Sequence, residues 1–213
     1  MTHAYSELYL DDAMENMGEM LDYAVNDCGF STEAFWNWFI GSGISEQWQR
    51  ANPKYIVGMS GVELVGEIVF QITGDRLEIT PVHKEGRSRE YWAGWIMAYY
   101  QWYRRVDFSD MMENGLSPAE VVSMYILHEA DPSKFVETAD RIMDKSRKER
   151  PSKLSRIRKA RGLTQQELSR QSGVSLRMIQ LYEQRQNDIN RSQARVVLYL
   201  ARILGCEIED LLE

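Results

Sequence analysis

The sequence predicts an all-α protein made of two helical domains. Apolar residues recur at spacings of three and four along most of the 213 residues, which is the period of an amphipathic helix. Capping signatures such as Ser60–Glu63 and Thr164–Glu167 open several of these segments. A charged run over 145–150, followed by Pro151, marks a boundary. We therefore expect an acidic helical interaction domain over residues 1–150 and a second helical domain over residues 151–213.

The first predicted helix covers residues 5–28 and stops at Gly29. Its apolar face consists of Leu10, Met14, Met17, Leu21, Ala24 and Cys28. Another face carries an acidic stripe, which consists of Asp11, Glu15, Glu19 and Asp22. Such a stripe is either a solvated face or a docking surface for a basic partner, and the sequence leaves both interpretations open.

Shorter elements follow this helix. Residues 32–40 predict an aromatic helix, residues 45–51 a second short one, and Asn52-Pro53 a turn. The capping box at Ser60 opens a longer helix that Gly74 closes. Residues 76–82 alternate weakly, so they are either a short strand or an extended linker.

The helix expected over residues 88–105 is the densest aromatic segment of the chain. Trp92, Trp95, Tyr99 and Trp102 follow one helical stripe. Aromatic side chains bury large areas, so this helix should form the centre of the N-terminal core. The same stripe could instead stack nucleobases, but its acidic surroundings argue against that interpretation.

Two more helices complete the N-terminal part. Ser117 and Pro118 are a cap and a first helical residue, and they open a helix that runs to about His128. Asp131 and Pro132 open the next one, which ends in the charged run before Pro151. That run is either a continuous helical connector or a loose linker.

Charge divides the chain in the same way. Residues 152–213 hold 11 Lys and Arg against 7 Asp and Glu, for +4, and residues 1–151 hold the remaining 14 against 25, for −11. Four of those seven acids follow Gly205, so residues 152–205 alone carry 11 minus 3, or +8. A basic module joined to an acidic one is typical of a DNA reader with a separate partner-binding domain, and it confines DNA contact to the C-terminal module.

The basic module contains three consecutive helices. The first runs from Lys153 to Arg161, the second opens at the capping box of Thr164, and the third starts after Ser175. Ser169 is small where two helix axes cross, and Gly173 tolerates the positive φ that a three-residue turn requires. Ile179 and Tyr182 should anchor the third helix, and Leu176, Arg177, Gln180 and Leu181 are left facing solvent, where they can enter a major groove.

This segment resembles the Cro/CI-type helix-turn-helix family, also called the XRE family. The residues that carry the resemblance are Arg158, Gly162-Leu-Thr-Gln-Gln-Glu-Leu168, Gly173-Val-Ser175, Ile179, Glu183 and the tail Leu200–Leu212. The resemblance covers about 60 residues and implies a five-helix DNA-binding domain at the C-terminus. One position departs from the family pattern: Arg185 stands where glycine is often found, two residues after Glu183.

The resemblance implies a role for each matching residue. Arg158 and Glu183 should form an internal ion pair. Leu176, Arg177 and Gln180 should face base edges, where Leu suits a thymine methyl, Arg suits guanine and Gln suits adenine. The residues expected to contact the DNA backbone are Thr164, Gln165, Ser175, Arg185, Asn187, Asn190 and Arg191. Such modules bind double-stranded DNA as dimers on two half-sites, so a homodimer is expected.

The N-terminal part resembles an uncharacterised bacterial domain that is fused to such modules. The resemblance rests on Leu10–Met20, Asn52–Ile56 and Tyr91–Trp95. It implies an antitoxin that binds a toxin and represses its own operon. The alternative is a ligand-sensing repressor with a pocket in the aromatic N-terminal core.

An enzyme, a cofactor and a metal site are not expected. His128-Glu129 lacks a second histidine at zincin spacing because position 132 is proline, and no P-loop or G-x-S-x-G motif occurs. The other catalytic candidates are His83, Asp107, Asp110 and Asp131. Cys28 and Cys206 have no partners at metal-ligand spacing.

The chain shows neither a signal peptide nor an apolar run long enough for a membrane span, so we expect a cytoplasmic bacterial protein.

Overall fold

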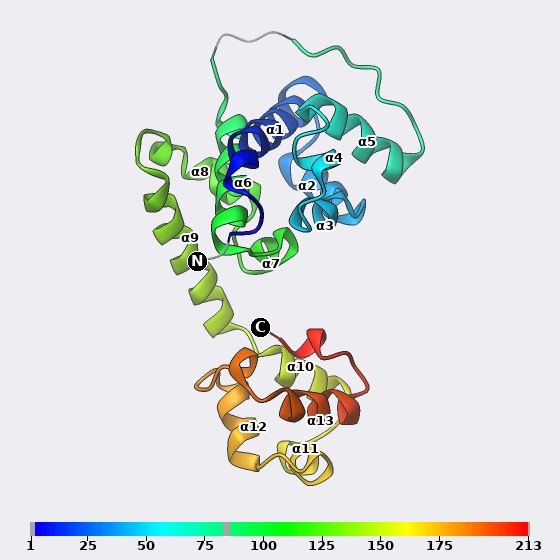
Figure 1. Ribbon diagram of the computed structural model, residues 1–213, viewed down its shortest axis with the longest axis vertical. Helices are drawn as coiled ribbons and strands as arrows, with labels where there is room; N and C mark the ends of the chain where they lie inside the picture. The colour runs from blue at the N-terminus through cyan, green and yellow to red at the C-terminus, as the bar shows by residue number, and fades with distance from the viewer. Residues whose placement is uncertain (1–2, 83–85, 213) are drawn as a thin grey trace. The chain divides into compact units, whose positions relative to one another are not determined.

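The computed structural model describes residues 3–82 and 86–212. The chain divides into two compact units, Met1–Met143 (unit 1) and Asp144–Glu213 (unit 2) (Figure 1). Both are helical, and the described residues contain no strand, which confirms the all-α fold class. No helix among them is long and apolar enough to cross a membrane.

Unit 1 begins with one long helical segment. The 3-10 turn η1 (Glu7–Tyr9), α1 (Leu10–Asp22) and the π-helical turn η2 (Tyr23–Asp27) follow one another without a break. The remaining helices are α2 (Thr32–Gly41), α3 (Ile44–Gln49), α4 (Pro53–Ile56), α5 (Gly61–Thr73), α6 (Arg89–Arg104), α7 (Phe108–Glu113), α8 (Pro118–Ser123), the 3-10 turn η3 (Tyr125–Glu129) and α9 (Pro132–Glu149). The predicted capping box of Ser60 is present, and Gly74 closes α5 in the left-handed conformation.

Four segments differ from expectation or settle an open choice, three of them in unit 1 and one at the start of unit 2. Residues 76–82 are extended without pairing, so the linker interpretation is right and the strand is not formed. The helix predicted to reach His128 ends at Ser123 and continues as a 3-10 turn. The short helix α7 was not expected, because its six residues are too few to show a helical period. The charged run before Pro151 is helical, since α9 continues to Glu149.

The core of unit 1 is built on the contact between α1 and α6 (Figure 1). Trp92 and Trp102 are buried as expected, but Trp95 and Tyr99 are only half-buried. The residues of α6 that lie closest to the backbone of α1 include Gly94 and, against Gly18, Tyr91, which is not part of the predicted aromatic stripe. The aromatic stripe therefore flanks the closest helix contact, because only a small residue fits between two backbones at that distance.

Glycine is required at that contact. A Cβ atom on Gly94 would lie 2.3 Å from the carbonyl oxygen of Met17, and one on Gly61 would lie 2.3 Å from the amide nitrogen of Met20. Both obstacles are backbone atoms of α1, which cannot move aside as a flexible side chain can. The helix α1 therefore packs against both α6 and α5, and each contact is possible only because glycine has no side chain.

The acidic stripe of α1 is largely engaged within unit 1. Glu19 accepts a hydrogen bond from the amide of Gly61 at 2.6 Å, which places a carboxylate at the start of α5. Asp22 accepts hydrogen bonds from Ser88 and Asn26, and Glu15 pairs with Arg87 at 3.5 Å. The stripe is therefore neither a simple solvated face nor a continuous free surface.

Unit 2 contains the end of α9 and a compact helical domain. Its elements are α10 (Lys153–Ala160), α11 (Gln165–Ser172), α12 (Leu176–Glu183), the 3-10 turn η4 (Ile189–Arg191), α13 (Ala194–Leu204) and the 3-10 turn η5 (Glu209–Leu211). The core is formed by Leu154, Leu168, Ile179, Tyr182, Leu200, Leu204 and Leu211. The last of the five expected helices is only the single turn η5, which places Leu211 in this core.

The glycine contact can be tested by two matched substitutions. Gly94→Ala should lower the free energy of unfolding of unit 1 by about 3 kcal/mol, because the added methyl group meets backbone. Gly66→Ala should instead raise it by up to about 1 kcal/mol, since no atom lies within 4 Å and alanine favours the helix. All six tryptophans lie within residues 36–102, so tryptophan fluorescence during urea denaturation reports on unit 1. Equal effects of the two substitutions would contradict the role of the contact.

Candidate nucleic-acid interface

The turn between α11 and α12 is fixed by side-chain hydrogen bonds. The capping box of Thr164 and Glu167 opens α11, and Gly173 closes it with φ 71°. The hydroxyl group of Ser169 donates to the carbonyl oxygen of Val174 at 2.7 Å, and the amide of Val174 donates to Ser172 at 3.3 Å. Ser175 caps α12, since its oxygen accepts the amide of Met178 at 3.2 Å. The turn residues that the sequence indicates are thus in the expected conformations.

The two sides of α12 differ in burial. Ile179 and Tyr182 are buried in the core, as expected, and the hydroxyl group of Tyr182 contacts that of Ser192 at 3.1 Å. Arg177 is exposed, and Leu176 and Gln180 are half-buried. Within the described part of the chain Arg177 makes no hydrogen bond or ion pair. The three residues expected at base edges therefore lie on one short helix whose other side is anchored.

Arg158 and Glu183 form the ion pair expected between the first and third helices of the domain. Arg158 Nε donates to Glu183 Oε1 at 2.6 Å and Nη2 donates to Oε2 at 2.9 Å, and the two side chains are only 9% and 6% exposed. Arg158 also donates to the carbonyl oxygen of Leu163 at 2.5 Å. Burial alone would raise the pKa of Glu183, but the hydrogen bonds from Arg158 and Gln165 outweigh it and lower that pKa. The carboxylate therefore stays charged inside the domain.

Gln165 belongs to the same network. Its side-chain amide donates to Glu183 Oε2 at 2.8 Å. An amide group carries two N–H donors, so this bond leaves the second one for another acceptor. The residue expected to hold a phosphate is thus positioned by the ion pair, which sequence reasoning did not anticipate.

The loop after α12 contains the other residues expected at the DNA backbone. Arg191 has a side chain 88% exposed and lies 3.4 Å from Asp188. The side-chain amide of Asn187 contacts the sulfur of Met178 at 3.9 Å, and the backbone amide of Asn190 donates to Asp188. The sequence places these residues on the surface correctly, and all three are exposed.

Arg185 makes structural hydrogen bonds that the sequence did not predict. Its backbone adopts the left-handed conformation with φ 52°, at the position where the resembling family often has glycine. Its guanidinium donates to the carbonyl oxygens of Arg147 and, at 2.6 Å, Arg150. These carbonyls lie at the end of α9, where a cation is favourable. The presence of arginine in place of glycine was the one sign in the sequence that Arg185 has a particular role, but it did not indicate that the carbonyl oxygens of Arg147 and Arg150 are its hydrogen-bond acceptors.

The candidates for catalysis do not assemble. His128 and Glu129 are neighbours on η3, 3.8 Å apart, and His128 lies in a cleft whose lining residues include no carboxylate. Over residues 3–82 and 86–212, no three His, Cys, Asp or Glu side chains are placed to share a metal ion. His83 lies outside the described residues.

Comparison with known proteins identifies the domain that contains these residues. Residues 153–213 match the family model of the Cro/C1-type HTH DNA-binding domain. Searches of curated proteins and of solved structures found no match to the chain.

The ion pair can be tested by removing one partner. Arg158→Met should lower the free energy of unfolding of unit 2 by about 3–5 kcal/mol, because it leaves the buried Glu183 carboxylate without its cation. Urea denaturation followed by far-ultraviolet circular dichroism measures this change, while tryptophan fluorescence should show unit 1 unaffected. Arg156→Met is the matched control, since Arg156 is exposed on the same helix. Similar stabilities for the two variants would contradict the structural role of the pair.

Proposed function

We propose that this DNA-binding transcription regulator reads specific base pairs in duplex DNA through α12, which belongs to the Cro/C1-type HTH DNA-binding domain of residues 153–213. The observation that carries the proposal is the exposed side of α12. Leu176, Arg177 and Gln180 lie there, and Arg177 has no partner within the described residues. In the major groove, arginine pairs with guanine O6 and N7, glutamine with adenine, and leucine with a thymine methyl.

The proposed contacts to the DNA backbone surround this helix. Thr164 and Gln165 stand at the start of α11, where amide groups and the helix dipole favour a phosphate, and Ser175 stands at the start of α12. Asn187, Asn190 and Arg191 offer donors from the loop. The proposed phosphate contact of Arg185 competes with the hydrogen bonds of its guanidinium to the end of α9. We therefore assign most backbone contact to the other residues.

A single module of this size contacts too few base pairs for high specificity. We propose that two copies bind as a homodimer on half-sites about one helical turn apart, roughly 34–36 Å. The expected operator is accordingly palindromic. The net charge of +8 over residues 152–205 supports association with the polyanion, and affinity should fall steeply as salt concentration rises.

We propose further that the protein is an autoregulatory repressor of the antitoxin type, whose unit 1 binds a basic toxin. The net charge of −11 over residues 1–151 supports a basic partner. Asp11 and Asp12 are exposed on α1, whereas Glu15, Glu19 and Asp22 are engaged within unit 1. The free negative charge of this helix is thus concentrated at its first turn, which is where partner contact is most favourable.

The second candidate function is that of a ligand-sensing repressor. One observation favours it: an aromatic cleft of about 210 Å³ opens beside α6 in unit 1. This interpretation and the antitoxin interpretation share the same DNA-reading module and differ in what unit 1 binds.

Binding to DNA upstream of the protein's own coding sequence tests the regulatory proposal. A footprint there at physiological salt, with affinity at least about 10³-fold above that for unrelated DNA, is the expected result. The product of the adjacent gene should then co-purify with the intact chain but not with an Asp11→Lys, Asp12→Lys variant. If the chain binds this DNA specifically but no product of the adjacent gene co-purifies with it, the antitoxin role is wrong and the proposed role in DNA recognition is retained.

Base reading by Arg177 makes a separate prediction. Arg177→Ala should cost about 1–3 kcal/mol at one base position of each half-site and relax the preference there. Selection of bound sequences from a random DNA pool measures that preference directly. Arg202→Ala, which removes the same charge from the exposed part of α13, is the matched control and should keep the preference intact. If Arg177→Ala weakened binding to every sequence equally, the assignment to base reading would be wrong.

A further inference from the structure

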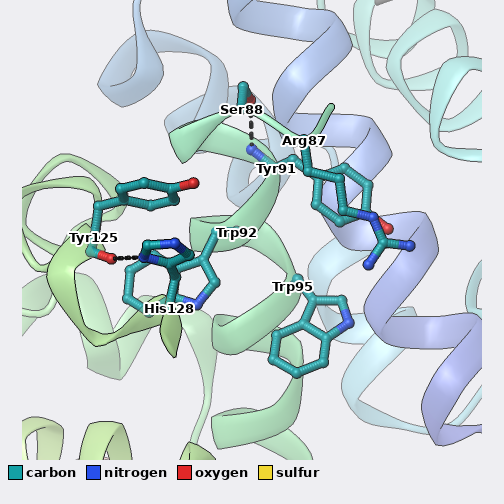
Figure 2. Close-up of a pocket in the computed structure, with 7 residues that line it drawn as sticks. All are labelled: Arg87, Ser88, Tyr91, Trp92, Trp95, Tyr125 and His128. Carbon is teal, nitrogen blue, oxygen red and sulfur yellow. Dashed lines mark hydrogen bonds between the residues drawn. The ribbon is translucent and has the colours of Figure 1, made fainter. Parts of the chain in front are cut away.

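Unit 1 contains a cleft whose lining is mostly aromatic. Seven residues line it: Arg87, Ser88, Tyr91, Trp92, Trp95, Tyr125 and His128. Figure 2 shows Tyr125 and His128 on one side of the cleft, and Arg87, Tyr91 and Trp95 on the other. The first two turns of α6, the two residues that precede them and the 3-10 turn η3 thus supply the lining.

The walls are held by ring contacts and hydrogen bonds. The rings of Tyr125 and His128 are stacked, with centroids 4.1 Å apart and planes at 3°. His128 Nδ1 lies 2.7 Å from the carbonyl oxygen of Tyr125, and because a carbonyl only accepts, Nδ1 carries the proton. Trp92 meets Tyr125 edge to face at 5.8 Å and is itself buried. These contacts orient flat faces toward the cleft before any ligand arrives.

The polar groups of the cleft are mostly hydrogen-bond donors. No carboxylate lines it, whereas Arg87 carries a fixed positive charge and lies 4.6 Å over the ring of Tyr91. Arg89 stacks on Tyr125 at 5.5 Å and adds a second cation nearby. Within residues 3–82 and 86–212, the indole N–H groups of Trp92 and Trp95 have no hydrogen-bond partner. A ligand anion can therefore pair with Arg87, whereas two of the ring faces that would attract a ligand cation already carry an arginine.

The pair between Arg87 and Glu15 does not cancel that preference. The two side chains are 63% and 61% exposed and lie 3.5 Å apart, and exposed pairs of this kind contribute at most about 1 kcal/mol. A ligand carboxylate that reaches Arg87 can therefore replace Glu15. Glu19 and Asp22 line a separate depression together with Arg87 and Tyr91, and Asp22 accepts the hydrogen bond of the Ser88 hydroxyl group.

The volume limits the size of the ligand. At about 210 Å³ the cleft is smaller than the sites of about 300–1,000 Å³ that hold drug-sized molecules. We propose that it binds a small planar aromatic carboxylate of one or two fused rings. The ring system stacks between the Tyr125–His128 pair and Trp95, and the carboxylate meets Arg87. The inference rests on the ligand-sensing candidate function and names its ligand class.

Calorimetric titration of the full chain without DNA tests the site. The probes are indole-3-carboxylate, its neutral carboxamide and the cationic 3-(aminomethyl)indole, which share one ring system. The expected result is a dissociation constant below about 1 mM for the carboxylate. The carboxamide should bind at least about 10-fold more weakly, and the cation should not bind measurably.

Two variants locate the binding. Arg87→Gln should reduce carboxylate affinity to the level of the carboxamide and leave carboxamide affinity unchanged, whereas Trp95→Leu should weaken both. Arg76→Gln, an exposed arginine outside the cleft, is the matched control and should change neither. Equal binding of the three probes, absence of binding, or loss of discrimination in Arg76→Gln would overturn the proposal.

Adding the carboxylate to a DNA-binding assay tests separately whether ligand binding at the site regulates DNA binding. A change in DNA affinity of at least about 3-fold supports sensing. If the carboxylate binds but DNA affinity is unchanged, the site exists and the sensing function on which the proposal rests is wrong. If calorimetry detects no carboxylate binding, the site is wrong, and the proposal that α12 reads base pairs is not affected.

Discussion

The DNA-binding unit depends on one buried carboxylate, that of Glu183. It lies on α12 and accepts hydrogen bonds from Arg158 on α10 and from Gln165 on α11, so the first three helices of the domain meet at a single charged group. A charge removed from water is costly unless its hydrogen-bonding capacity is filled, and here three donors fill it. This network joins α12 and the side chain of Gln165, which links the proposed base reading to the proposed phosphate contact.

A different constraint governs unit 1, where α1 approaches α5 and α6 at positions occupied by glycine. Because the obstacles to a larger residue are backbone atoms, the contact leaves little freedom for adjustment. Tyr91 of α6 lies against Gly18 of α1, and Tyr91 and Trp95 are the two half-buried aromatic residues of α6 that line the cleft. The same close packing that builds the core therefore also creates the site that we propose for an aromatic acid.

Arg185, which stands where helix-turn-helix domains of this type often have glycine, has a structural role at the end of α9. Arg185 adopts the backbone conformation that glycine usually takes, at a cost of about 1–3 kcal/mol for a non-glycine residue. Its hydrogen bonds to two carbonyl oxygens at the end of α9 offset that cost. The loop after α12, which carries three of the proposed backbone contacts, is thereby fastened to the helix that precedes the domain.

The sequence by itself determined the helical class, the helix ends at Gly74, Gly162 and Gly173, and the helix-turn-helix register, because caps and turns depend on residues close together in the chain. It also identified the ion pair, through the resemblance of residues 152–213 to a known family. Only the tertiary structure decided which acids of α1 are free, where Arg185 points, and that Trp92 and Trp95 of the aromatic stripe border a cleft. Each of these depends on residues far apart in the chain, such as Arg185 and Arg150, which are separated by 35 positions, and helical periodicity carries no information at that range.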